Sequence, residues 1–119
     1  MPDIRIKRVY EPEAPSDGYR IFVDRLWPRG IKKENLHYDL WAKEAAPSAP
    51  LRRWYHQNPE GRRTEFRKRY LAELAHSEAV RALADKIEDK PAVTLLIASK
   101  NAAENHALVL RDYLEKRAQ

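Results

Sequence analysis

The heptapeptide DRLWPRG, residues 24–30, places side chains that could bind an anion in a segment whose proline and glycine mark it as a loop. Arg25 and Arg29 could supply positive charge to a phosphate or carboxylate, and Trp27 lies between them. A tryptophan is costly at the surface of a loop unless it stacks on a ring of a ligand or packs into the core. The sequence leaves these two interpretations open.

A second segment with this chemistry, SKNAAENH at residues 99–106, follows an apolar run. Asn101 and Glu104 predict the start of a helix there, and the free amides at a helix N-terminus can receive an anion. In open α/β sheets, ligands lie beyond the carboxyl ends of the strands. If the strands before the two segments are parallel neighbours, Ser99 and Lys100 would join the loop arginines in one pocket for a phosphate or carboxylate.

His106 is the candidate for proton transfer in such a pocket, because histidine titrates close to neutral pH. Asp24, at the start of the loop, is the second catalytic candidate. His106 also lies on an apolar stripe with Leu110 and Tyr113, which favours the alternative that it is a half-buried structural residue. Whether the protein is an enzyme stays open at this point.

The other histidines show no pattern of a metal site. His37, His56 and His76 lack ligand spacing and a paired carboxylate motif, and the chain contains no cysteine. The absence of cysteine also excludes disulfides and thiolate catalysis. We predict no metal and no cofactor.

The chain has a formal net charge of +5 at pH 7, and its excess of basic residues lies in the segment 51–69. Aromatic residues alternate with arginines there, as on a nucleic-acid-binding surface. Phe66 and Tyr70 fall on the inward spacing of a helix, so we expect them in the core. A solvated helix face is the simpler alternative, and no zinc-finger or RNP motif is present. The remaining cations form a candidate phosphate footprint: Arg52, Arg62, Arg63, Arg67 and Lys68.

Hydrophobic periodicity predicts the elements that position these residues. Alternation at residues 4–9 and 19–24 indicates strands, and the continuous apolar run 92–98 indicates a strand buried on both faces at the centre of a sheet. Residues 35–42 fit either a short strand or one helical turn. Apolar spacing, N-cap residues and prolines predict four helices: one between Ser48 and Asn58, one from about Pro59, one from Ser77 that ends before Pro91, and one capped by Asn101.

These elements define a fold class. The 119 residues suffice for one domain, so we expect a single compact α/β domain over residues 1–119, with a small, at least partly parallel sheet flanked by helices. No apolar run approaches the roughly 18 residues of a membrane helix, and the N-terminus lacks a secretory signal. We expect no membrane role and a cytoplasmic location. No feature of the sequence indicates the oligomeric state.

Four stretches together resemble a known family: VDRLWPRG, WAKEAAPSAPLRRWY, EFRKRYLAEL and LLIASKNAAENHALVL. The chain resembles the YeaO-like proteins, small bacterial proteins grouped as a domain of unknown function, over nearly its whole length. The resemblance implies a compact α/β fold and no established reaction. The polar positions of its motifs are site candidates: Asp24, Arg25, Trp27, Arg29, Lys43, Ser48, Arg52, Arg69, Asn105 and His106.

Related branches of that family carry a Cys-His pair where this chain has Asn105 and His106. The resemblance implies that any nucleophilic or metal-binding chemistry of such a cysteine is lost here. Lys43 or Ser48 could lie near a pocket, although a role of Ser48 as a helix N-cap is the simpler account.

These observations lead to one main expectation, a cytoplasmic protein whose strand ends form a pocket for a phosphorylated or carboxylated small molecule. The loop arginines and Lys100 would supply charge, Trp27 a stacking face and His106 a proton-transfer group. A nucleic-acid-binding module that uses residues 52–69 and a non-catalytic interaction protein are the alternatives.

Overall fold

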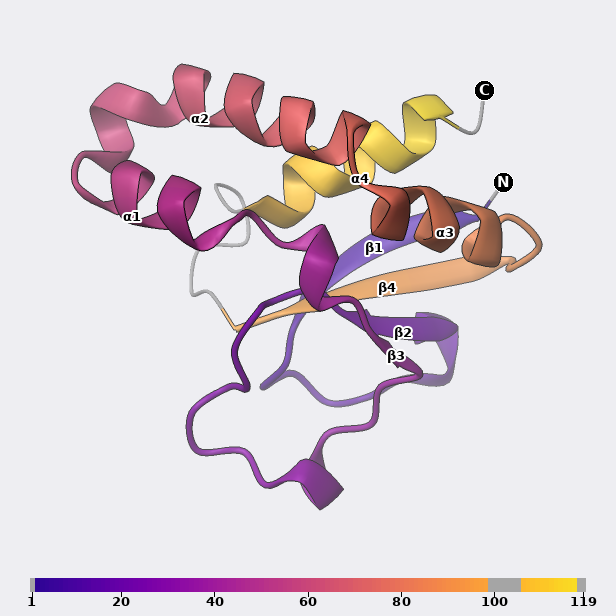
Figure 1. Cartoon of the computed structure of the whole chain (residues 1–119). Coiled ribbons are helices and arrows are strands. Elements are labelled where there is room, and N and C mark those ends of the chain that lie inside the picture. Colours follow the sequence, from indigo (N-terminus) through magenta and orange to yellow (C-terminus); the bar gives the residue numbers. More distant parts are fainter. Residues whose placement is uncertain (1, 99–105, 118–119) are drawn as a thin grey trace.

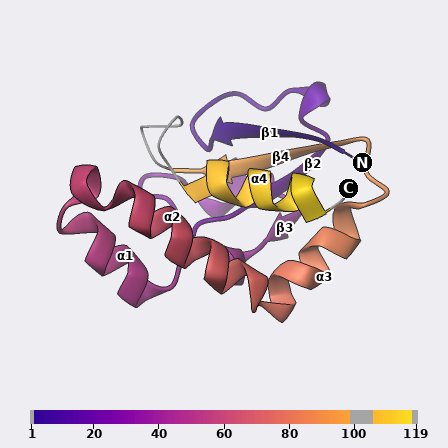
Figure 2. The same cartoon turned by 90° about the horizontal axis from the view of Figure 1, so that it is seen from above.

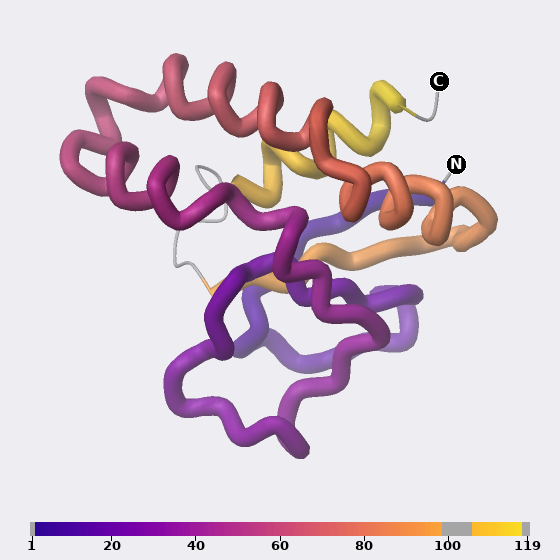
Figure 3. The backbone as a smooth tube through the Cα atoms, in the orientation of Figure 1, coloured from indigo at the N-terminus to yellow at the C-terminus, as the bar shows by residue number. Residues whose placement is uncertain are grey.

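A computed structural model describes residues 2–98 and 106–117 of the chain. Figures 1 and 3 follow the chain through its elements. The strands are β1 (Asp3–Arg8), β2 (Tyr19–Phe22), β3 (Leu40–Trp41) and β4 (Ala92–Ile97). The α-helices are α1 (Ala49–His56), α2 (Pro59–Ala75), α3 (Glu78–Ile87) and α4 (His106–Arg117). Short 3-10 helices lie at Pro15–Asp17, Lys33–Asn35 and Lys43–Ala45.

The strands that the structure describes form one sheet in the order β1-β4-β2-β3, with every pairing parallel. β4 lies between β1 and β2, which confirms that the apolar run after Pro91 forms an interior strand. Five of its six residues are buried, as expected for a parallel strand with both faces covered. The predicted α/β class is confirmed, and the sheet is parallel throughout the described residues.

The two faces of the sheet are covered differently. The four α-helices lie on one face, where Ile21 and Leu95 pack in the same core as Tyr70 of α2 (Figures 1 and 2). The chain between β2 and β3 covers the other face, where Phe22 and Leu96 form a second, smaller core. Because successive side chains of a strand point to opposite faces, neighbouring residues of β2 and β4 serve these two cores.

Local sequence signals set the helix starts. Ser48, Asn58 and Ser77 are the N-caps of α1, α2 and α3, and each side chain accepts a backbone N–H from the first turn. The helices predicted from these three positions are confirmed. Residues 35–42, which the sequence left open, contain the end of a 3-10 helix and the two-residue strand β3. The predicted cap Asn101 lies outside the described residues.

The described helices are also too short or too polar to cross a membrane.

A buried cluster of charges lies at the start of β2. Asp17, which is 3% exposed, accepts hydrogen bonds from Lys7 Nζ at 2.9 Å and from the guanidinium of Arg20. Thr94 of β4 donates its hydroxyl to the Asp17 carbonyl at 2.8 Å. Burial opposes the charge of Asp17, yet hydrogen bonds from the Ala14 N–H, Lys7 and Arg20 hold the pKa of its carboxyl below the usual 3.8.

We expect Asp17→Asn to lower the free energy of unfolding by about 3 kcal/mol, because the substitution leaves the buried Arg20 guanidinium without its charge partner. In the wild type, the stability that the Asp17 carboxylate contributes is present above its unfolded-state pKa of about 3.9. It is lost as the pH falls through the lower pKa of the folded state. Urea unfolding at neutral pH measures the first effect, and an acid series measures the second.

Asp3→Asn is the matched control, because Asp3 pairs with Arg5 in solvent and its side chain is 65% exposed. We expect this substitution to change the free energy of unfolding by less than about 0.5 kcal/mol. Equal effects of the two substitutions would contradict the role of Asp17 as the centre of a buried ion cluster.

Candidate functional site

A cavity of about 630 Å³ lies beside the carboxyl ends of β2 and β4. Its walls come from Tyr10, the loop 24–29, residues 46–47, one side of α1, Pro59 and Phe66 of α2, Ala98 and His106. β2 and β4 are parallel neighbours, which is the condition under which the segments that follow them meet at one edge of the sheet.

The predicted site residues divide between this cavity and other places. Arg25 and Arg29 both line it. Ser99, Lys100 and Asn105 lie outside the described residues.

Asp24 joins three elements at the edge of the cavity. Its Oδ2 accepts the N–H of Ala98, directly after β4, at 2.9 Å. Its backbone carbonyl accepts the indole N–H of Trp41 in β3 at 2.7 Å. Its Oδ1 lies 3.4 Å from Nε2 of His106 in α4. The carboxylate lines the cavity and also holds the ends of the strands together.

His106 is a neutral group at physiological pH. Its Nε2 lies 3.0 Å from the carbonyl oxygen of Val23, which can only accept, so this nitrogen carries the proton. Burial lowers the pKa of the imidazole below 6.5, and the positive charge of Arg52 acts in the same direction. Together they outweigh the Asp24 carboxylate and the hydrogen bond to Val23. Nδ1 therefore keeps its lone pair.

Arg25 uses its guanidinium on the backbone of the opposite wall. Nε donates to the carbonyl of Pro47 at 2.8 Å, and Nη2 donates to the carbonyl of Ala46 at 3.3 Å. Both residues line the cavity. Arg25 thus positions this wall. Only the N–H groups of its guanidinium that these two bonds do not use could contact a ligand.

The same wall is attached to α2. The buried Tyr70 hydroxyl donates to the carbonyl of Ala45, and burial raises the pKa of this hydroxyl well above its usual 10.0. Glu73 accepts the N–H of Ser48 at 2.9 Å and the Ser48 hydroxyl at 2.6 Å. Ser48 is a helix cap anchored to α2, and it is not part of the cavity lining.

Trp27 packs among aromatic rings on the face of the sheet opposite the helices. Its ring centroid lies 5.8 Å from that of Phe22 and 5.6 Å from that of Trp41, both edge to face. Tyr38 adds a third edge-to-face contact at 5.8 Å, and the indole N–H donates to the carbonyl of Ile31 at 2.6 Å. Packing accounts for the position of Trp27. The ring is half-buried and also lines the cavity, so contact with a ligand stays a prediction.

Two cations of the cavity have no bonded partner among the described residues. Arg52 lies on α1, is half-buried and lines the cavity, and no described residue accepts a hydrogen bond from its guanidinium. The guanidinium of Arg29 also lines the cavity and has no acceptor among the described residues, but Arg29 is exposed in its loop. Arg52 is the more enclosed of the two.

Tyr55 and His56 line the cavity from the same helix as Arg52, and neither was selected as a site residue from the sequence. Residues three and four positions apart share one face of a helix. The spacing from Arg52 is therefore the signal that could have identified both.

Two further candidates lie away from the cavity lining. Lys43 Nζ lies 4.1 Å from the ring centroid of Trp41, over its face. The Arg69 guanidinium lies 4.0 Å from the ring centroid of Trp54, and its Nε donates to Glu65 at 3.0 Å. These cations stabilise aromatic surface on the protein itself.

The candidate phosphate footprint also contains cations with internal partners. Arg62 donates to a backbone carbonyl and to a glutamine side chain, and Arg67 donates to an aspartate of α4 at 3.5 Å. Arg63 has a partner as well. Lys68 is exposed, and Arg52 belongs to the cavity.

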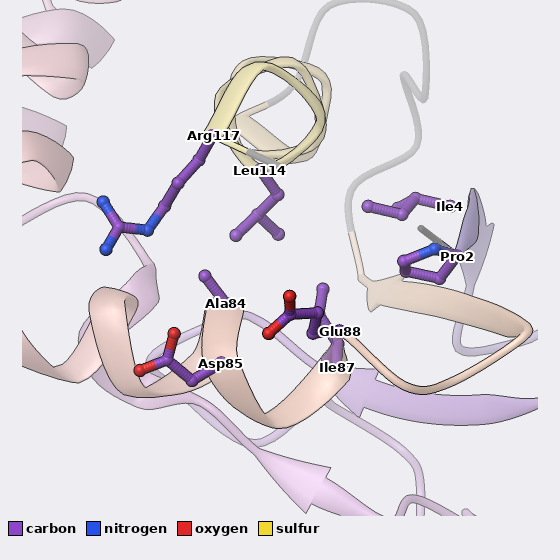
Figure 4. A pocket seen from close by; sticks show the side chains of 8 residues that line it. All are labelled: Pro2, Ile4, Ala84, Asp85, Ile87, Glu88, Leu114 and Arg117. Atoms are coloured by element: carbon purple, nitrogen blue, oxygen red, sulfur yellow. The ribbon is translucent and has the colours of Figure 1, made fainter. Parts of the chain in front are cut away.

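A second cavity, of about 450 Å³, lies between α3 and α4 near the start of β1 (Figure 4). Ile4, Ile87 and Leu114 give it an apolar lining, and it carries charges of both signs. Figure 4 shows the carboxylates of Asp85 in α3 and of Glu88 directly after it, and the guanidinium of Arg117 in α4. It contains none of the site residues predicted from the sequence, so the first cavity is the candidate site.

The fold and the cavity define a class of protein, a small parallel α/β domain with helices on one face and arginines at the carboxyl edge of its sheet. Within residues 2–98 and 106–117, no three His, Cys, Asp or Glu side chains gather as metal ligands. The chain belongs to the family described as the inactive DUF488-N3 subclade, DUF488-N3i, whose model matches residues 3–119.

Two relatives support this assignment. The chain is 54% identical over 113 residues to Uncharacterized protein YeaO of Escherichia coli (strain K12). The matched region covers 94% of this chain and 96% of that protein. It is 44% identical over 114 residues to Uncharacterized protein Rv3073c of Mycobacterium tuberculosis (strain ATCC 25618 / H37Rv). The matched region covers 96% of this chain and 95% of that protein. No solved structure matches the chain significantly. The resemblance to YeaO-like proteins is confirmed.

We expect the imidazoles of His106 and His37 to titrate on opposite sides of pH 6.5. Burial lowers the pKa of His106, whereas the hydrogen bond to Glu13 at 2.6 Å, assisted by Asp39, raises the pKa of His37. The stability that the His37 pair contributes is full below the unfolded pKa and falls as the pH rises through the raised value. Burial of the neutral His106 contributes stability that is full above the unfolded pKa and is lost as the pH falls through the lowered pKa of the folded state. Two-dimensional NMR of the imidazoles over a pH series measures both.

The signals are assigned with the variants His106→Gln and His37→Gln. A His106 imidazole that titrates above 6.5 would contradict the neutral, Nε2-protonated ring.

We expect Arg25→Ala to lower the free energy of unfolding by about 1–3 kcal/mol, because two carbonyls of the cavity wall lose a charged donor. Arg29→Ala removes an exposed cation from the same loop and should change the free energy of unfolding by less than about 0.5 kcal/mol. Urea unfolding of the two variants provides the comparison. A neutral effect of Arg25→Ala would mean that these bonds do not hold the wall.

Proposed function

We propose that the protein binds a small molecule through a phosphate or carboxylate group in the cavity at the ends of β2 and β4, and that Arg52 is the principal contact of that group. The supporting observation is the place of Arg52 in the cavity wall, half-buried and without an acceptor among the described residues. Arg25, by contrast, already donates to two carbonyls. A guanidinium in this position can form a bidentate, charge-assisted pair with an oxyanion.

The charge of the cavity supports an anionic ligand. Arg25, Arg29 and Arg52 line it, whereas Asp24 is its only acidic lining residue among those described. The described part of the lining therefore has a net positive charge even with His106 neutral. The volume of about 630 Å³ falls in the range of small-molecule sites.

Binding without turnover is the activity that this site supports best. The family is described as inactive, and the chain contains no cysteine. His106 and Asp24 are the two residues that could move a proton, and both are hydrogen-bonded within the fold. His106 Nε2 faces the carbonyl of Val23, and the Asp24 carboxylate accepts the N–H of Ala98. A small-molecule enzyme is the alternative, and it would depend on the lone pair of His106 Nδ1.

A nucleic-acid interface on α1 and α2 is the second candidate. Arg53 and Lys68 are exposed on these helices, and Arg52 is shared with the cavity. The internal partners of Arg62 and Arg67 reduce the number of cations that a phosphate backbone could neutralise, so we favour the cavity.

We expect inorganic phosphate and alkyl phosphates to raise the Tm of the wild type, because a ligand that binds only the folded state stabilises it. Arg52→Ala should weaken their binding about tenfold or more, since it removes a charge-assisted pair. Arg53→Ala is the matched control, because Arg53 is an exposed neighbour on α1 that is not part of the cavity lining. Calorimetric titration measures both affinities.

Equal losses in the two variants, or no stabilisation by any small anion, would overturn the proposal. Stabilisation by oligonucleotides alone, with an affinity that falls steeply with salt, would support the second candidate instead.

A further inference from the structure

We infer that the anionic group bound by this cavity is carried on a planar aromatic ring, with Tyr55 as the residue that selects the ring. This inference rests on the proposed function, because it takes Arg52 as the contact of the anion. The cavity would thus take aryl phosphates or aryl carboxylates in preference to inorganic phosphate, alkyl phosphates or aliphatic acids.

The first observation is the face that α1 presents to the cavity. Arg52, Tyr55 and His56 line it and occupy helix positions i, i+3 and i+4. Side chains at these spacings are neighbours, with about 5–6 Å between Cβ atoms. A ligand whose oxyanion meets Arg52 can therefore place its next few atoms against Tyr55.

The second observation is the way in which the Tyr55 ring is held. It stacks on Phe66 of α2, with ring centroids 4.2 Å apart and planes inclined by 27°. Phe66 is 8% exposed and belongs to the main core, so the stack rests on a fixed base. Tyr55 is half-buried and lines the cavity, as Phe66 does beneath it.

These two observations together define a ligand chemistry. A rigid aromatic residue beside a cation that has no acceptor among the described residues favours a flat, polarisable group next to a negative charge. A flexible alkyl chain would lose more conformational freedom in the same place and would make fewer contacts with a ring face. Small-molecule sites commonly combine an aromatic wall with a few polar contacts that fix orientation.

The test compares phenyl phosphate with cyclohexyl phosphate, which has a ring of similar size without aromaticity, and with inorganic phosphate. Benzoate and cyclohexanecarboxylate form the corresponding carboxylate pair. Calorimetric titration of the full chain gives the affinities. We expect phenyl phosphate or benzoate to bind about tenfold more tightly than its cyclohexyl counterpart, as base stacking on aromatic side chains suggests.

Variants of Tyr55 assign the preference to one side chain. Tyr55→Leu should abolish the difference between the phenyl and cyclohexyl ligands, and Tyr55→Phe should keep it. Binding of cyclohexyl phosphate by Tyr55→Leu shows that the variant is folded. If Tyr55→Leu does not fold, Tyr55→Met takes its place in the comparison, because methionine fills an irregular gap in a core without an aromatic ring.

The outcomes separate this inference from the proposed function. Equal affinity of the wild type for phenyl and cyclohexyl ligands, with binding lost in Arg52→Ala, would overturn the inference and leave the proposed function standing. Failure of all these anions to bind would overturn both. A preference for phenyl ligands that survives in Tyr55→Leu would overturn the role of Tyr55.

Discussion

The arrangement of the cavity depends on the attachment of Asp24 at the end of β2. Separate atoms of this residue bond to the chain after β4 and to Trp41 in β3, and a further oxygen faces His106 in α4. The ends of three neighbouring strands and the first turn of a helix are thus joined at one residue. Because the loop 24–29 leaves the sheet from this junction, the pairing of the strands fixes where its arginines lie. The position of the cavity follows from the order of the sheet as much as from the sequence of the loop.

The uneven covering of the sheet explains the tryptophan between the two arginines. A parallel sheet is stable when both faces are covered, and here α1 to α4 all lie on one face. On the other face, Trp27, Tyr38 and Trp41 pack around Phe22 and supply the apolar area that a helix would otherwise provide. Arg25 reaches the wall of the cavity instead. The loop 24–29 therefore contributes Trp27 to the core on one side of the sheet and Arg25 to the wall of the cavity.

The sequence predicts the elements well where the periodicity is long, as in the apolar run of β4 and in the helices that start after Ser48, Asn58 and Ser77. It could not predict which arginine of the cavity has no acceptor among the described residues. Two donors of Arg25 are taken by carbonyls more than twenty positions away, and only the folded chain brings them together. The burial of Asp17 was missed for the same reason, since a turn-forming sequence gives no sign that distant cations meet it.

One wall of the cavity has a consequence for the kinetics of association. Residues 45–48 are bound by Tyr70, by Glu73 and by Arg25 in the free protein, so the backbone of this wall has lost its conformational freedom on folding. A molecule that enters the cavity meets a preorganised surface and does not have to order this segment. For the ligand proposed above, encounter would then lead to the bound state without a slow rearrangement of the wall. We expect related ligands to differ in affinity mainly through their dissociation rates.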